Sequence, residues 1–314
     1  MKLFRSIAIA TAAVAFAIAV LGSWIRINGD GMTCPDWPLC HGRIIPTLAG
    51  GIVLEWSHRA AAFVESWLVV ATIVLGIRVS RGIAGLRAGL WTLGGLFGVQ
   101  VLLGGATVRL ANSPVSVALH WGAGMALLGT LVCVAALAVL APSPARPRPV
   151  GDPAVPWLAA ASLAAFATMC LGAYVSSSFA GLACSTIPAC DGTLLGTTPA
   201  QVAQMLHRGA GGLFAMVAAV AAAVAWRRSS HRVRAFAAFG LALVALQIVL
   251  GLANVVLALP DGLREAHAAN AAVTFVAFAL AMILAAFDGR RDAVRTAPAR
   301  GSERRLGTTA SEAS

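Results

Sequence analysis

The sequence predicts an all-α membrane protein with eight transmembrane helices, arranged as two tandem four-helix bundles related by internal duplication. This prediction rests on the composition, on eight long apolar runs and on a set of residues that recurs in the two halves. The 314-residue chain is 59% hydrophobic and 11% charged, with a mean hydropathy of +0.84, whereas soluble domains carry about 25% charged residues. Its net charge of +11 lies in short basic clusters between apolar runs, so no nucleic-acid partner is expected.

Each of the eight apolar runs is long enough to cross the lipid bilayer, because about 20 helical residues span its hydrocarbon core. The runs lie near residues 7–25, 51–77, 88–108, 116–141, 157–176, 203–226, 235–258 and 266–287. The first run follows a basic start, as a signal peptide does, but it lacks a small-x-small cleavage pattern before Trp24. We therefore predict that it is retained as a span.

The lysines and arginines predict the orientation of the chain. Basic clusters precede the first run and follow the second, fourth, sixth and eighth, and such clusters favour the cytoplasmic side. We expect both termini in the cytoplasm and the cysteine-containing loops outside. No mitochondrial presequence precedes the first run, which favours a bacterial plasma membrane.

Matching residues recur at an offset that drifts by only three positions, which indicates an internal duplication. Four spans per repeat give both halves the same orientation, as in parallel repeats. The matched positions are Leu21-Gly22 with Leu171-Gly172, Cys34 and Cys40 with Cys184 and Cys190, His58 with His207, Gln100 with Gln247, Gly104 with Gly251, and His120 with His267.

The repeat predicts four segments. Residues 1–141 form the N-terminal half and residues 157–288 the C-terminal half. Residues 142–156 are rich in proline, as expected for a semi-rigid cytoplasmic linker. Residues 289–314 are polar, small and basic, which predicts a disordered cytoplasmic tail.

Four histidines, two in each half, lie near the outer ends of even-numbered spans. A single histidine in a helix is commonly a satisfied polar group, but His58, His120, His207 and His267 are paired by the repeat and level with one another. Neutral imidazole binds iron, copper and zinc, and two imidazoles on separate helices of a bundle suit the axial positions of a haem. We therefore predict one haem site in each half.

The halves differ at the residue three positions before the first histidine. This is Glu55 in the N-terminal half and Gln204 in the C-terminal half. A carboxylate beside a metal site can act as an acid, a base or an electrostatic stabiliser, so we predict chemistry in the N-terminal half and electron transfer in the other. Alternatively, Glu55 pairs with Arg59. Glu65 lies near the same helix face as His58, about 10 Å deeper in the membrane. It could relay protons or form part of a polar patch. Its counterpart in the other half is Phe214.

Arg59 and Arg208 each follow one of these histidines. They are candidate partners for haem propionates, or they extend to the membrane surface.

Two outer loops each contain a C-x5-C pattern, formed by Cys34 with Cys40 and by Cys184 with Cys190. Paired thiols outside the cytoplasm tend to oxidise, which predicts two local disulfides over the haem pockets. A redox-active first pair is the alternative.

Together these motifs resemble the haem A synthase family, over about residues 5–290. The resemblance rests on the first cysteine loop, Glu55-x-x-His58-Arg59, Gln204-x-x-His207-Arg208 and the histidines His120 and His267. It implies that the N-terminal half binds haem O between His58 and His120, and that the C-terminal half binds haem b. It further implies oxidation of a porphyrin methyl group to a formyl group by successive hydroxylations, with Glu55 as the catalytic carboxylate.

The resemblance also suggests a haem O synthase and an electron donor as partners. Two other functions compete with it. A dihaem b-type cytochrome would transfer electrons without altering haem, but it does not account for Glu55 in place of an amide. A haem carrier or exporter is also built from parallel repeats, but it fits the four matched histidines less well.

Overall fold

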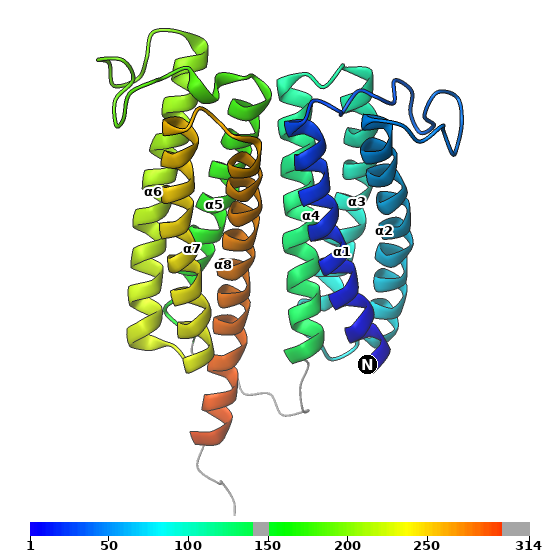
Figure 1. Cartoon of the computed structure of the whole chain (residues 1–314). Coiled ribbons are helices and arrows are strands. Elements are labelled where there is room, and N and C mark those ends of the chain that lie inside the picture. Colours follow the sequence, from blue (N-terminus) through cyan, green and yellow to red (C-terminus); the bar gives the residue numbers. More distant parts are fainter. Residues whose placement is uncertain (141–150, 297–314) are drawn as a thin grey trace, which may run out of the picture.

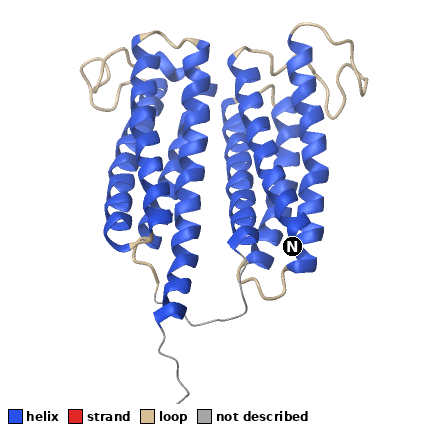
Figure 2. Cartoon of the chain, turned by 60° about the horizontal axis from the view of Figure 1, so that its bottom comes forward, coloured by secondary structure: helices blue, strands red, loops and turns tan. Residues whose placement is uncertain are grey.

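The computed structural model describes residues 1–140 and 151–296, and the helices are the ones that the hydropathy pattern predicts. Figure 2 shows helices joined by loops, without strands in the described residues. Eight helices are long and apolar enough to cross a membrane, which confirms the predicted fold class. They are α1 (Lys2–Ile27), α2 (Gly51–Val79), α3 (Leu86–Arg109), α4 (Pro114–Leu140), α5 (Val155–Ser177), α6 (Pro199–Arg228), α7 (His231–Val256) and α8 (Asp261–Thr296), with a 3-10 turn, η1 (Ala180–Leu182), after α5.

Most helices extend beyond the predicted apolar runs. Helix α8 continues to Thr296, past the predicted end of the C-terminal half at residue 288. Helix α5 begins at Val155, inside the predicted linker. Hydropathy locates the part of a helix that lipid covers, whereas arginine and alanine continue a helix readily beyond it. Linker residues 142–150 and tail residues 297–314 lie outside the described residues.

The helices form two four-helix bundles that stand side by side (Figure 1). Within each bundle, every helix packs against the next one, and the first also packs against the fourth. The bundles meet where α4 packs against α5 and α8, and where α1 packs against α8. The loops α1–α2 and α5–α6 lie at the same end of the molecule; we call it the loop end, and the opposite end, where the chain starts, the linker end.

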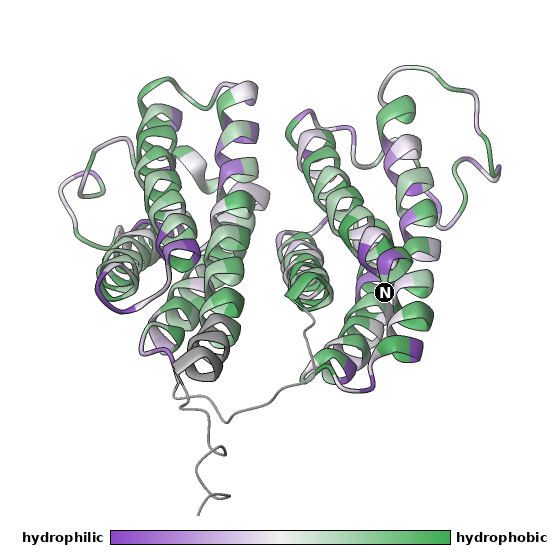
Figure 3. Ribbon diagram, turned by 90° about the horizontal axis from the view of Figure 1, so that it is seen from below, coloured by the Kyte–Doolittle hydropathy of each residue, from purple (hydrophilic) through white to green (hydrophobic). Residues whose placement is uncertain are grey.

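Helices α4 and α8 are the most buried of the eight, because each belongs to its own bundle and also to the contact between the bundles. Gly129 allows their close approach, since a Cβ there would lie 2.8 Å from the ring of Phe275. Large apolar side chains elsewhere point outward; Phe63, Leu102 and Met216 are each more than half exposed. Figure 3 shows hydrophobic residues along the helices of both bundles, as expected for a surface that faces lipid.

Candidate functional site

The four predicted histidines lie at one level near the loop end. Helices α2, α4, α6 and α8 all begin at that end, and each carries its histidine about two turns from its first residue. The histidines of each half therefore come from the second and fourth helices of one bundle. This is the arrangement that the repeat predicts.

Each histidine ring lies against a glycine of a neighbouring helix. A Cβ at Gly22 would lie 2.8 Å from Cε1 of His58, and one at Gly104 would lie 3.4 Å from Cε1 of His120. In the other half, the corresponding distances are 2.8 Å from Gly172 to His207 and 3.2 Å from Gly251 to His267. The four glycines thus leave the space that the imidazoles fill, so the repeated glycines serve the histidines as well as helix packing.

The His207 and His267 rings are spaced as two ligands of one metal ion would be. Two imidazoles that bind a metal from opposite sides at about 2 Å each have ring centres roughly 6 Å apart. The observed centroids are 6.4 Å apart. His207 Nδ1 lies 3.1 Å from the Thr168 carbonyl oxygen; a hydrogen donated there leaves Nε2 free to bind a metal.

A protein-only metal site is not formed by these histidines. No group of three or more His, Cys, Asp or Glu side chains in the described part of the chain could hold a metal ion. A pair of imidazoles at this spacing therefore fits a metal whose remaining ligands come from a non-protein group, as the four porphyrin nitrogens do in haem.

Glu55 supports the loop above the histidines of the N-terminal half. Its Oε2 accepts hydrogen bonds from Thr33 Oγ1 at 2.9 Å and from the backbone N–H of Cys34 at 2.8 Å. Its Oε1 pairs with Arg59 at 2.6 Å, so the alternative role that the sequence suggested is present. Glu55 is 5% exposed, and every one of these contacts fixes its carboxylate at the base of the loop.

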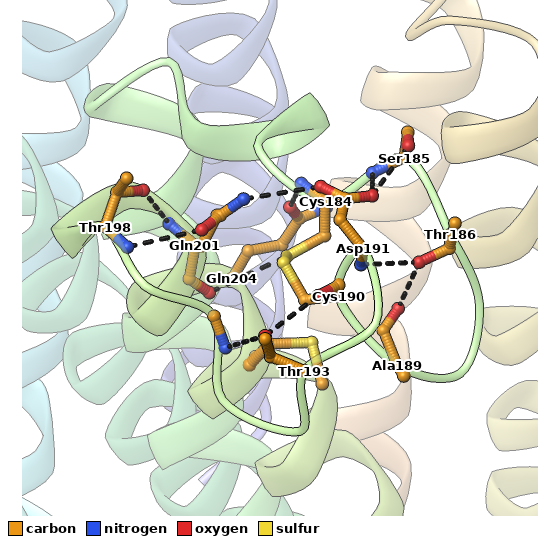
Figure 4. The surroundings of a disulfide bond; sticks show 12 residues. Cys184, Ser185, Thr186, Ala189, Cys190, Asp191, Thr193, Thr198, Gln201 and Gln204 are labelled. Atoms are coloured by element: carbon orange, nitrogen blue, oxygen red, sulfur yellow. Dashed lines mark hydrogen bonds between the residues drawn. A yellow bond between two sulfur atoms is a disulfide. The ribbon is translucent and has the colours of Figure 1, made fainter.

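Gln204 occupies the same place in the C-terminal half. Its Oε1 accepts from the backbone N–H of Cys184 at 2.6 Å (Figure 4). Its Nε2 donates to the Gly181 carbonyl at 2.7 Å. An amide therefore holds the first cysteine of its loop as the carboxylate does. The difference between the halves at this position is the negative charge rather than the loop contact.

Both predicted disulfides are present, between Cys34 and Cys40 and between Cys184 and Cys190. An aspartate closes each loop. Asp36 accepts from the backbone N–H groups of His41 and Gly42 at 2.6 and 2.7 Å, and these bonds, that of Gly42 foremost, lower its pKa. In the other loop, hydrogen bonds from Ser185 lower the pKa of Asp191 in the same way.

The two arginines that follow the histidines are bonded to these loops. Arg59 donates to the carbonyl oxygens of Cys34, Asp36 and Leu39. Arg208 donates to those of Cys184 and Thr186. The loop contacts of both guanidinium groups were not foreseen from the sequence, although the matched Arg positions after the histidines were a signal of a shared role.

The sequence also did not predict several side-chain hydrogen bonds that join neighbouring helices. Asn270 donates to the side-chain oxygen of Gln247 at 2.7 Å, and Gln247 donates to the His267 carbonyl at 3.0 Å. Arg26 of α1 donates to Ser177 of α5 at 3.1 Å and so links the two halves. Asn270, Arg26 and Ser177 have no like residue at the matching position of the other half, so the repeat indicated only Gln247, which matches Gln100.

The fold and these paired histidines define a class: a multi-pass membrane protein with one candidate haem-binding centre in each of two similar bundles. The chain belongs to the COX15-CtaA family of cytochrome oxidase assembly proteins, whose profile matches residues 51–279. That range includes Glu55 and all four histidines, while the first disulfide precedes it. The predicted family is thus confirmed.

Several relatives named Heme A synthase match along most of their length. The protein from Bacillus licheniformis is 29% identical over 278 residues, which cover 85% of this chain and 91% of the relative. The one from Symbiobacterium thermophilum is 30% identical, covering 80% and 85%. Part of a Protoheme IX farnesyltransferase from Halobacterium salinarum also matches, at 27% identity over 41% of this chain and 28% of that protein.

Proposed function

We propose that this protein is a haem A synthase, a membrane oxidoreductase that converts a methyl group of haem O into a formyl group. The observation that carries the proposal is the pair of matched histidine centres, of which only the N-terminal one has a carboxylate three residues before its first histidine. Relatives that share most of the chain are named for this activity. The substrate is assigned to the N-terminal half and a resident haem b to the C-terminal half.

His207 and His267 would hold the iron of haem b. Their 6.4 Å spacing and the bond of His207 Nδ1 to the Thr168 carbonyl support this assignment, because an axial histidine usually donates its other ring N–H to such an acceptor. Bound there, haem b supplies one-electron transfer. The protein's part is to fix the positions of the two rings.

His58 and His120 would hold the iron of the substrate haem O. Each hydroxylation of its methyl group adds one oxygen atom; with water as the oxygen source, two electrons and two protons are released, and the geminal diol then loses water to give the formyl group. Positive charge that develops on the methyl carbon would be stabilised by the Glu55 carboxylate. Its donors Thr33, Cys34 and Arg59 hold it in place beforehand, and a preorganised charge is effective in a water-poor site.

Arg59 and Arg208 are proposed to share their guanidinium groups between loop carbonyls and haem propionates. Their present acceptors are backbone oxygens, the Met205 sulfur and, for Arg59, the Glu55 carboxylate. A propionate would add a charged acceptor to each arginine. In this role each arginine would connect a disulfide loop to the ligand beneath it. The alternative role for the first loop is that its Cys34–Cys40 disulfide is redox-active.

The membrane orientation and the partners belong to the same proposal. The basic clusters favour an orientation with both termini in the cytoplasm and the disulfide loops outside, and we place the protein in a bacterial plasma membrane. A haem O synthase is a plausible supplier of substrate, since a segment of a Protoheme IX farnesyltransferase resembles this chain. An electron-transfer partner is required to exchange electrons with haem b.

The test is extraction and chromatography of haems from the purified chain, expressed in cells that make haem O. We expect haem b together with haem O or haem A. Two haem b per chain and no haem A would instead indicate an electron-transfer cytochrome, and an absence of haem would overturn both centres.

The variant Glu55→Gln tests the carboxylate. Because Gln204 shows that an amide can hold such a loop, the variant should fold and retain haem b. We expect formyl product to fall about 100-fold, the scale of losing one electrostatic stabiliser. Haem A at the unchanged rate would end the catalytic role of Glu55.

A further inference from the structure

Glu65 is a buried carboxylate without a partner inside the N-terminal bundle. It is 6% exposed, and neither of its oxygens has a hydrogen-bond partner. It lies on the buried face of α2 that also carries Glu55 and Val69, and Val69 packs against Leu93 and Leu127 of α3 and α4. A buried polar group without a partner costs stability, so this residue calls for an explanation.

The C-terminal half fills the same position with an aromatic ring. Phe214, the counterpart of Glu65, is equally buried and packs edge-to-face on Phe278 of α8, with ring centroids 5.9 Å apart. At this level the C-terminal bundle is therefore closed by apolar side chains. The N-terminal bundle instead presents a carboxylate, and Leu131 stands where the repeat would place the second ring.

A second unpaired acceptor lies nearer the histidines of the N-terminal half. The side-chain oxygen of Gln100 is buried and has no partner, whereas that of its counterpart Gln247 accepts from Asn270. The repeat offset places Ala123 where Asn270 stands in the other half. Glu65 and Gln100 both lie deeper than the histidines of the half to which we assign the substrate. The unpaired side-chain oxygens of the C-terminal half, on Glu265 and Asn254, lie instead near the loop end.

A proton path toward the linker end does not account for Glu65. The next polar groups on this face are the hydroxyls of Thr72 and Thr11, which lie 2.9 Å apart. One turn further, Gly76 is enclosed by Leu90 and Phe4, which belong to an apolar cluster. The line of polar groups therefore ends inside the bundle. An ion pair is absent as well, since the salt bridges of the described residues join other groups.

The depth of Glu65 suits one edge of a bound haem. It lies seven residues from His58, or about 10 Å along the helix axis, toward the linker end. A flat ligand held between imidazoles of α2 and α4 lies in a plane that contains the bundle axis, so one of its edges points toward the linker end. Haem O differs from haem b in a hydroxylated isoprenoid chain, attached to the porphyrin edge away from the propionates.

We propose that Glu65, assisted by Gln100, binds the hydroxyl group of the isoprenoid chain of the substrate and so selects haem O for the N-terminal half. The hydroxyl would donate its hydrogen to the carboxylate, which then has the partner that it lacks in the chain alone. Phe214 offers no such acceptor, so the C-terminal half would take haem b. This inference rests on the proposed function and adds the feature by which one chain keeps two similar haems apart.

The experiment is a titration of the full-length protein, carrying haem b in its C-terminal half, with haem O and with haem b, followed by haem absorbance. The measured quantity is the ratio of the two dissociation constants at the vacant centre. Glu65→Leu should reduce the preference for haem O about fivefold or more, as for the loss of a buried hydrogen bond. Glu65→Gln, which keeps an acceptor, should retain most of the preference, and the matched control Phe214→Leu should leave it unchanged.

A second measurement needs no variant. The unmodified protein is titrated with a dehydrated haem O analogue that lacks the hydroxyl group, and its affinity should fall toward that of haem b. An unchanged preference in Glu65→Leu, or equal binding of haem O and the analogue, would overturn the inference. The proposed function fails separately, if the unmodified protein neither binds haem O nor forms haem A.

Discussion

The two bundles place matching histidines against matching glycines, yet they differ in whether the polar groups deeper than those histidines are paired. In the C-terminal half, Gln204 and Gln247 use both ends of their amides in hydrogen bonds within the chain. In the N-terminal half, Gln100 and Glu65 keep buried oxygens without partners. The unpaired side-chain oxygens of the C-terminal half, on Glu265 and Asn254, lie near the loop end. Below the histidines, paired groups suit a resident cofactor, whereas open acceptors suit a ligand that enters and leaves.

The comparison also distinguishes the negative charge at this position from the hydrogen bond that holds the loop. Glu55 and Gln204 both bond the backbone N–H of the first loop cysteine, so the loop can be held by either side chain. Exchanging the acid for the amide therefore changes the electrostatics of one half without removing the contact that positions the loop.

The largest expected effect comes from removing one histidine from each half in turn. His207→Ala should reduce the haem b that copurifies with the chain to about one tenth or less, because an axial ligand is lost. His58→Ala is the matched variant and should retain haem b while losing bound haem O. Haem content is measured by extraction and chromatography. Loss of haem b from His58→Ala alone would reverse the assignment of the two halves.

A smaller effect is expected from the glycines that face the histidines. Gly172→Ala would place a Cβ 2.8 Å from the His207 ring, and relieving such crowding costs about 1–3 kcal/mol. It should weaken haem b binding, while Gly22→Ala should spare haem b and slow haem A formation. Gly211→Ala, at a position of α6 with open space, is the control, and thermal unfolding with haem titration measures all three. If Gly211→Ala weakened haem binding as much as Gly172→Ala does, the glycines beside the histidines would have no special role.

The smallest expected effect concerns the pH dependence of the first disulfide loop. The pKa of Asp36 is lowered by its bonds to the Gly42 and His41 amides, so its contribution to loop stability is present above its ordinary value of 3.8. It is lost as the pH falls through the lower value of the folded state. Hydrogen exchange of those two amides should accelerate there relative to the intrinsic rate, and Asp36→Asn should flatten the change. An identical profile in that variant would contradict the prediction.

The spans, the cysteine pairs and the level of the histidines could all be read from the sequence. Length and hydropathy locate a transmembrane helix because the bilayer thickness fixes how many apolar residues it needs. The repeat then fixes which residues are equivalent, and equal distances from the loop end place equivalent histidines at equal depth. The far end of α8 at Thr296 was not foreseen, since the polar residues past the apolar run gave no sign of where the helix stops.

Only the tertiary structure decided which side chains meet. A transmembrane helix is apolar on its lipid face and on its packed face alike, so its hydropathy does not encode its rotation about its own axis. The contact of Gly22 with His58, the three donors around Glu55 and the isolation of Glu65 all depend on that rotation. The sequence by itself determined the eight spans and the set of candidate residues, and packing of the helices determined which carboxylate is held and which is left without a partner.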